Sequence, residues 1–359
     1  MPKFVLLLLA CGLGGDDPEA TERPSPDPTV PDPTGTESVV TGDTGTPVTT
    51  DTVPDTGFTV DGPTATTAAT GDTGTVVVGD CDLSNFATRA LSVTEITDIP
   101  EAEDFEFDAT GHLVNVSGAL DAILKTTRAG TTTLVAPYES LEIAGTRMLP
   151  GGDLVFADEW DGSIVRVDMA TGARSVLASG LVSPNSLAVN SDGVVFVGGF
   201  GEVVRVFPDG TVERLADVPG EDFDGLALSP DEQTLYLNQD DGGAVAAMVF
   251  DAKGAVLSFR VIIDLINGGW GTSLNGASVD SCGRYYVIDV GGRLLRVDPV
   301  TETVVEYADL DPMGAGFTTS LRFGSGVGGW ETNHIYVIDR NDTVWDLETD
   351  IDGAVLPHL

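Results

Sequence analysis

The sequence predicts an all-β protein whose folded part is a six-bladed β-propeller of four-stranded antiparallel blades. The first observation is the stretch 184–216, where the runs SLAV, VVFV, EVVRVF and TVERLA are separated by the turn signals NSDG, GGFG and FPDG. The second is that similar stretches recur with a period of about 40 residues. The third is that one such sheet is too small to bury its own apolar face, so its copies must pack around a common axis.

The copies align strand by strand. The first strand and its turn recur as GTRMLPGGD, DGLALSPDE, NGASVDSCG and TSLRFGSG, and the second strand as HLVNV, DLVFAD, TLYLNQ, RYYVID and HIYVID. The third strand is clearest as GSIVRVD, GEVVRVF and GRLLRVD. Counting the block that begins near Glu103, there are six units. The segment 89–99, RALSVTEITDI, alternates like a strand, and we expect it to pair with the last blade and close the ring.

Residues 1–11, MPKFVLLLLAC, form the first of three regions. One Lys precedes an apolar run that is too short to span a bilayer and fits a secretory signal. The last four residues, LLAC, resemble a bacterial lipobox, so we expect Cys11 to be lipidated and to anchor the exported protein to the outer membrane or cell surface. The alternative is an ordinary signal peptide with a cysteine there by chance.

Residues 12–80 are rich in Thr, Asp, Pro and Gly, with 13 acidic side chains and one basic side chain. Such a segment cannot bury enough apolar surface to fold, so it is predicted to be a disordered linker. An extended, self-repelling linker would hold the propeller, predicted for 81–359, away from the membrane.

The region 81–359 carries 44 acidic side chains against 15 basic ones. This balance argues against nucleic acid or anionic lipid as a partner and favours cations near the surface. Solvated acidic blade edges, which keep a secreted protein soluble, account for the charge equally well. We expect a monomer that binds a small-molecule substrate or ligand and meets the membrane only through its N-terminal lipid.

The cysteines add one possible link. With Cys11 lipidated, Cys81 and Cys282 remain, and in an exported protein they either pair or stay separate thiols. Pairing would tie the start of the propeller to the turn between the first two strands of blade five.

The candidate site is the mouth of the central channel, where the first strand of each blade begins. Counting back eight positions from the turn glycine, or its equivalent, gives Glu103, Ala144, Asn185, Asp224 and Asn275, with Thr319 matched by its strand letters. Carboxylate and amide oxygens in blades one, three, four and five suit Ca²⁺, or Mg²⁺ and Mn²⁺ in a tight cavity. The positions hold no His or Cys, which argues against zinc. The alternative is a set of polar strand-entry residues satisfied by water.

The stretches FDGLALSPDEQTLYL and SLNGASVDSCGRYYVIDVGGRLLRVDP resemble the SMP-30/gluconolactonase family of six-bladed propellers, over about residues 101–359. The resemblance implies a divalent metal, usually calcium, held by a Glu in blade one and by Asn, Asn and Asp later, and in many members lactone hydrolysis. By position, Glu103 and Asn185 match the Glu and the first Asn. The position of the second Asn is occupied here by Asp224. The position of the Asp, which is also the family's general base, is occupied by Asn275. Asp224 is therefore our candidate base.

Further positions bear on the substrate. Where the resemblance implies Gly-Pro after the blade-one Glu, this chain has Asp104-Phe105, and Ser183 replaces a substrate-binding Arg, so Ser183 is assigned to the substrate site. Trp270, in the long connection between blades four and five, is assigned either to a lid that stacks on a ring or to the packing of its own loop. The carboxylates at the ends of second strands are alternative bases or simple loop caps: Asp158, Asp289 and Asp339.

The sequence thus predicts an exported, membrane-tethered, calcium-dependent hydrolase of a lactone or ester. The competing hypothesis is a non-enzymatic cell-surface binding propeller whose metal is structural or absent, because propellers host many unrelated functions.

Overall fold

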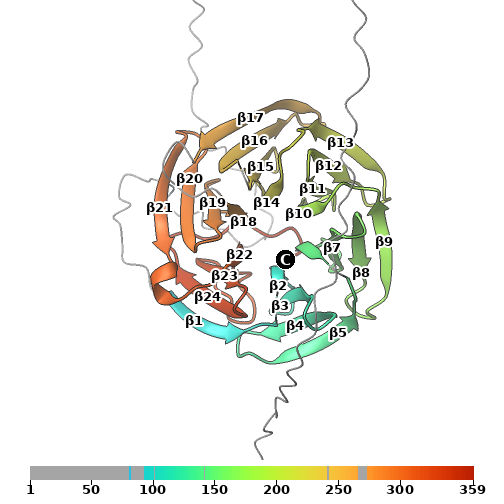
Figure 1. Ribbon diagram of the computed structural model, residues 1–359, viewed down its shortest axis with the longest axis vertical. Helices are drawn as coiled ribbons and strands as arrows, with labels where there is room; N and C mark the ends of the chain where they lie inside the picture. The colour runs from blue at the N-terminus through green and yellow to red at the C-terminus, as the bar shows by residue number, and fades with distance from the viewer. Residues whose placement is uncertain (1–80, 82–92, 101, 141, 241, 266–272) are drawn as a thin grey trace, which may run out of the picture. The chain divides into compact units, whose positions relative to one another are not determined.

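The computed structural model describes residues 81, 93–100, 102–140, 142–240, 242–265 and 273–359. These residues form six four-stranded antiparallel sheets around a central channel, which confirms the predicted six-bladed propeller (Figure 1). The predicted signal 1–11 and linker 12–80 lie outside the described residues. Within the described part, no helix has the length and apolar character needed to cross a membrane.

The blades follow one another along the chain. Blade one contains β2 (Ala102–Phe107), β3 (His112–Ser117), β4 (Ala122–Thr127) and β5 (Thr132–Pro137). Blade two contains β6 (Ile143–Met148), β7 (Leu154–Asp158), β8 (Ser163–Val167) and β9 (Arg174–Ser179). Blade three contains β10 (Pro184–Val189), β11 (Val195–Gly199), β12 (Glu202–Val206) and β13 (Val212–Asp217). Blade four contains β14 (Phe223–Leu228), β15 (Thr234–Gln239), β16 (Ala244–Phe250) and β17 (Val256–Asp264).

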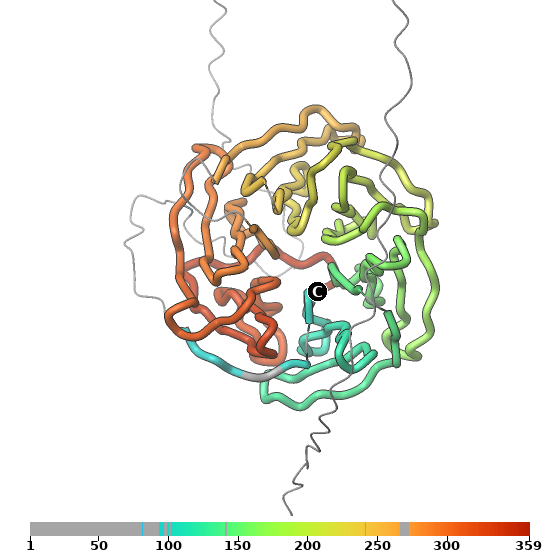
Figure 2. Tube along the Cα trace, in the orientation of Figure 1, coloured from blue at the N-terminus to red at the C-terminus, as the bar shows by residue number. Residues whose placement is uncertain are grey.

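Blade five contains β18 (Leu274–Val279), β19 (Tyr285–Asp289), β20 (Arg293–Asp298) and β21 (Thr303–Asp309). A short 3-10 helix, η2 (Asp311–Met313), leads to β22 (Thr318–Phe323), β23 (His334–Asp339) and β24 (Thr343–Glu348) of blade six. The ring is closed by β1 (Val93–Asp98), which pairs antiparallel with β24 and confirms the expected closure (Figures 1 and 2). Without β1, the outer edge of β24 would present unpaired backbone groups to solvent.

Apolar side chains fill the spaces between neighbouring blades, as the alternating sequence patterns require. Where blade one meets blade six, Phe107 packs against Trp330 and Tyr336, with ring centroids 4.9 and 5.6 Å away. All three side chains are fully buried. The two ends of the propeller chain are therefore joined by an aromatic core as well as by a shared sheet.

Each first strand carries a β-bulge at the same place. In all six blades the pairing between the first and second strands slips near the start of the first strand. A bulge leaves a residue out of the ladder and re-aims its side chain. The residues left out include every position that the repeat alignment selected: Glu103, Ala144, Asn185, Asp224, Asn275 and Thr319.

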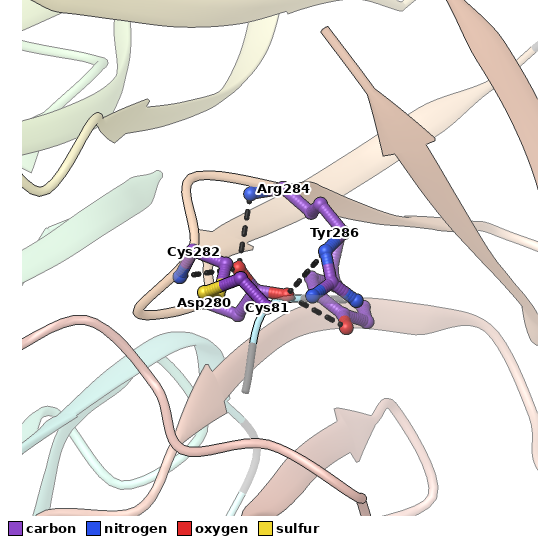
Figure 3. The surroundings of a disulfide bond; sticks show 5 residues. All are labelled: Cys81, Asp280, Cys282, Arg284 and Tyr286. Carbon is purple, nitrogen blue, oxygen red and sulfur yellow. Dashed lines mark hydrogen bonds and ion pairs between the residues drawn. A yellow bond between two sulfur atoms is a disulfide. The ribbon is translucent and has the colours of Figure 1, made fainter. Parts of the chain in front are cut away.

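A disulfide joins Cys81 to Cys282 in the turn between β18 and β19, 201 residues apart (Figure 3). The carboxylate of Asp280 shapes this turn by accepting hydrogen bonds from the Cys282 and Arg284 backbone N–H groups at 2.9 and 3.0 Å. The Tyr286 hydroxyl donates to the same carboxylate at 3.1 Å. Because β18 begins at the channel mouth, this turn lies at the opposite end of the strand, away from the candidate site.

Candidate functional site

A cavity of about 300 Å³ lies at the channel mouth, and its wall contains all four candidate metal ligands: Glu103, Asn185, Asp224 and Asn275. Residues far apart in the chain meet here because equivalent positions of successive blades face one axis. The bulge in each first strand turns them inward.

Apart from Ile143, the wall comes from three repeated positions. The bulge residues of blades one to five form one ring. The residues two positions earlier form a second: Glu142, Asp222, Ser273 and Phe317. The residues that follow the second strands form a third: Glu159, Asp240, Val290 and Arg340. The sequence predicted only the first ring, although the residues of the other two rings also recur at equivalent positions of the blades.

The cavity is strongly acidic. Its lining contains six carboxylates: Glu103, Glu142, Glu159, Asp222, Asp224 and Asp240. Among the described residues that line it, Arg340 alone is basic. Like charges held close together in a partly enclosed space repel one another, so the site as built favours a bound cation.

Asn275 carries an unpartnered oxygen in this wall. The side chain is 2% exposed, and its Nδ2 donates to the Thr318 carbonyl at 2.9 Å. Its Oδ1 is buried and has no hydrogen-bond partner among the described residues. Burying an unsatisfied acceptor costs about 1–3 kcal/mol, which a bound cation would offset. The nitrogen is therefore fixed, and the oxygen remains for a ligand.

Asp224 has a strongly perturbed carboxyl group at the mouth. Burial, followed by repulsion from Glu103 and Asp240, raises its pKa well above the usual value. Burial and like charge both disfavour the ionised form, and a nearby cation would reverse the second effect. This is the behaviour of a carboxylate placed for a metal ion or for proton transfer.

Glu159 is a functional candidate that the sequence did not reveal. Burial, and then repulsion from Glu142 and Asp222, raises its pKa to about 7, and a hydrogen bond with Ser183 opposes the rise. Its signal was its position directly after Asp158, at the end of a second strand. A carboxyl group that titrates near neutral pH is suited to accept and return a proton.

The other predicted site residues are placed differently. Ser183 does not line the cavity but contacts its wall through Glu159, and its backbone has φ +39°. Trp270, assigned to a lid or a packed loop, and Cys11, assigned to lipidation, lie outside the described residues.

The three carboxylates at the ends of second strands are loop caps, and none lines this cavity. Asp158 accepts hydrogen bonds from Tyr138 and Ser140, and Asp289 pairs with Arg293. Asp339 accepts from the backbone of Asn341 and Thr343 and from the Trp345 indole. Their hydrogen-bond partners therefore favour the interpretation as loop caps over the interpretation as alternative bases.

Below the mouth, a buried charge network forms the channel floor. Asp104 accepts hydrogen bonds from Arg147 at 2.5 Å and from Arg322 at 2.8 and 3.0 Å. Ser320 and the Thr146 backbone N–H also donate to it, at 2.5 and 2.8 Å. Each oxygen of Asp104 thus has several donors, and this carboxylate has no need of an added cation.

The donor set at the mouth restricts which cation would fit. Among the described residues, no three Asp, Glu, His or Cys side chains are arranged to hold a metal ion together. A cation at the bulge ring would therefore depend on the Asn185 and Asn275 amides beside the two carboxylates. Oxygen donors of this mixed kind match calcium, which accepts loose geometry and completes its shell with water.

Comparisons with known proteins agree with this architecture. The family model described as SMP-30/Gluconolactonase/LRE-like region matches residues 123–338. A gluconolactonase of Zymomonas mobilis subsp. mobilis is 26% identical over 176 residues, which are 41% of this chain and 49% of that protein. The chain thus spans about half the length of this relative.

Two solved structures show the same fold at low identity. A gluconolactonase from Xanthomonas campestris has a TM-score of 0.59 and 21% identity, over 72% of this chain and 89% of that chain. The calcium-binding protein regucalcin from Agrobacterium tumefaciens has a TM-score of 0.54 and 17% identity, over 72% and 96%.

Proposed function

The chain belongs to the SMP-30/gluconolactonase/LRE-like family, and from that premise we propose that it is a divalent-metal-dependent hydrolase of a lactone or related ester. The observation that carries the proposal is the cavity at the channel mouth. It gathers two carboxylates and two amides at equivalent bulges, and it contains the unpartnered Oδ1 of Asn275.

Calcium is the metal that this donor set fits best, with Glu103, Asn185, Asp224 and Asn275 as its protein ligands. When bound, the ion would polarise the carbonyl group of the substrate and stabilise negative charge on its oxygen. The bulge residues would position the cation, while the other residues that line the cavity would orient a small molecule beside it.

Asp224 is the proposed general base. It would take a proton from a water molecule as the water oxygen bonds to the carbonyl carbon. The ring C–O bond then breaks, and the leaving oxygen receives the proton that Asp224 took from water, which gives a hydroxy acid and restores the base. Asn275 cannot take a proton, so its role is restricted to holding the cation. Glu159, on the same wall, is a second group that exchanges a proton near neutral pH.

Export and membrane tethering form the second part of the proposal. The lipobox-like end at Cys11 motivates it, and the Cys81–Cys282 disulfide supports it, because disulfides persist in oxidising compartments. We place the propeller as a monomer on a linker, at the outer membrane or cell surface, where it would meet small molecules.

A non-enzymatic binding propeller is the second candidate function. The pairing of Glu103 with Arg340 favours it, because a metal ligand engaged by a guanidinium is less available to a cation. The amide at Asn275, where the family resemblance implies a basic Asp, favours it as well.

Hydrolysis of a lactone panel, with calcium or with a chelator, separates the two functions. We expect calcium-dependent turnover that falls by about 10²–10⁴-fold in Asp224→Asn, the range for loss of a general base. Asp217→Asn, which changes an exposed aspartate on β13, is the matched control and should keep full activity. Calcium binding without turnover by the wild type would instead support the binding propeller.

A further inference from the structure

Arg340 contacts the first candidate metal ligand directly. Its Nη2 lies 2.8 Å from Glu103 Oε2, and its guanidinium carbon lies 4.6 Å from the centroid of the Phe317 ring. The Arg340 side chain is 52% exposed and that of Glu103 is 28% exposed. The ion pair is therefore open to solvent on its arginine side.

From this geometry we propose that Arg340 is a tethered competitor of the metal ion: its guanidinium holds Glu103 in the metal-free protein and releases it when a divalent cation binds. The inference deepens the proposed function and rests on its metal site. In this role, Arg340 sets the affinity for the metal ion and takes no part in making or breaking bonds.

The backbone under Arg340 is fixed, while its side chain is not. The Arg340 N–H donates to the Phe317 carbonyl at 2.9 Å, and the Asp339 carboxylate accepts from the Asn341 and Thr343 N–H groups at 2.9 and 3.2 Å. The turn is therefore rigid. A long, half-exposed arginine side chain can leave one partner and remain stacked on Phe317 without any movement of this turn.

Charge explains why the guanidinium and the metal exclude each other. Both are cations that gain from Glu103, and both would lie within a few ångströms of the same carboxylate, where like charges repel strongly. In the metal-free cavity, Arg340 offsets part of the repulsion among six carboxylates. A bound divalent cation supplies that charge instead, so the arginine is no longer needed there.

The arginines of the channel floor show what a permanent pairing looks like. Arg147 and Arg322 hold Asp104 with side chains only 9% and 4% exposed. Arg340 differs from both in exposure, because more than half of its side chain is open to solvent.

Calorimetric titration of the full-length protein with Ca²⁺ tests the proposal. We expect Arg340→Gln to bind calcium about tenfold more tightly than the wild type, because one competing charge is removed. Arg340→Lys keeps the charge and should stay near the wild-type affinity. Arg260→Gln, which removes an arginine from an exposed ion pair with Glu302 on the outer face, is the matched control and should not change the affinity. Circular dichroism verifies that each variant is folded.

The outcomes distinguish this inference from the proposed function. If the wild type binds calcium and Arg340→Gln binds it equally well or more weakly, the inference is overturned, because an arginine that merely orients Glu103 would support affinity. The metal site would still stand. Binding by Arg340→Gln alone would support the inference. Binding by neither protein would overturn both.

Discussion

Two levels of the same channel treat their carboxylates in opposite ways. Glu103 and Asp104 are neighbours in the sequence, and both belong to the bulge of β2. At the floor, Asp104 is buried and receives hydrogen bonds from two arginines. At the mouth, six carboxylates share a cavity in which Arg340 is the one basic residue among the described lining residues.

This difference separates the charges that stabilise the fold from those that are available to a ligand. The floor network joins blade one to blade two through Arg147 and to blade six through Arg322. A buried carboxylate with a full set of donors is satisfied in the native arrangement of these blades and in no other arrangement. At the mouth, burial and repulsion between carboxylates raise the pKa of Asp224, and a bound cation would stabilise this unpaired charge.

The largest effect is expected at the floor. Asp104→Ala would leave Arg147 buried without its carboxylate and Arg322 with only its longer contact to Glu106, at 3.7 Å. Breaking a buried ion pair in this way costs about 3–5 kcal/mol of the free energy of unfolding. Urea unfolding of the metal-free proteins measures the loss.

Asp224→Asn is the matched change at the mouth. It removes one of several repelling carboxylates, so the metal-free variant should be as stable as the wild type or more stable. If the two substitutions lowered the free energy of unfolding equally, the distinction between floor and mouth would be wrong.

A smaller effect is expected from pH at the mouth. Burial raises the pKa of Glu159 from 4.5 to about 7 in the folded protein, so the folded state keeps this proton to higher pH than the unfolded state. The metal-free protein should therefore lose stability as the pH rises from about 4.5 through about 7. Urea unfolding over this range measures the slope.

Glu159→Gln should reduce that slope but not abolish it, because the raised pKa of Asp224 contributes in the same direction. Glu213→Gln, on the exposed strand β13, should leave the slope unchanged. Saturating calcium should also flatten it, because the cation stabilises the ionised carboxylates that rising pH creates. A slope as steep in Glu159→Gln as in the wild type would show that Glu159 is not one of the titrating groups.

The sequence predicted those features that repeat from blade to blade. The turn spacing specified the six blades, the alternation of 89–99 indicated ring closure, and one repeated position specified the bulge ring. Glu159, Asp240 and Arg340 occupy another repeated position, but its residue type varies between blades, so no common chemistry marked it. The partner of Glu103 lies 237 residues away, and nothing local to either residue indicates that contact.

The smallest effect is expected at the end of the channel opposite the mouth, where Asp108 begins the turn between β2 and β3. Burial alone would raise its pKa, but hydrogen bonds from the Lys125 ammonium and the His112 N–H lower it to about 2. The Lys125 Nζ lies 2.7 Å from Asp108 Oδ2. Since the folded pKa is below the unfolded value of 3.8, this stabilisation is present above about pH 4 and is lost as the pH falls towards 2.

Lys125→Gln should therefore lower the free energy of unfolding by about 1 kcal/mol at neutral pH, a value discounted for solvent screening of the partly exposed pair. The gap between variant and wild type should narrow as Asp108 is protonated, in urea unfolding at about pH 7 and about pH 3. Lys253→Gln, in an exposed turn, is the control and should show no gap at either pH. If the stability difference between Lys125→Gln and the wild type stayed constant down to about pH 3, Lys125 would act through packing and not through its charge. Paired charges would then stabilise the channel floor but not this turn.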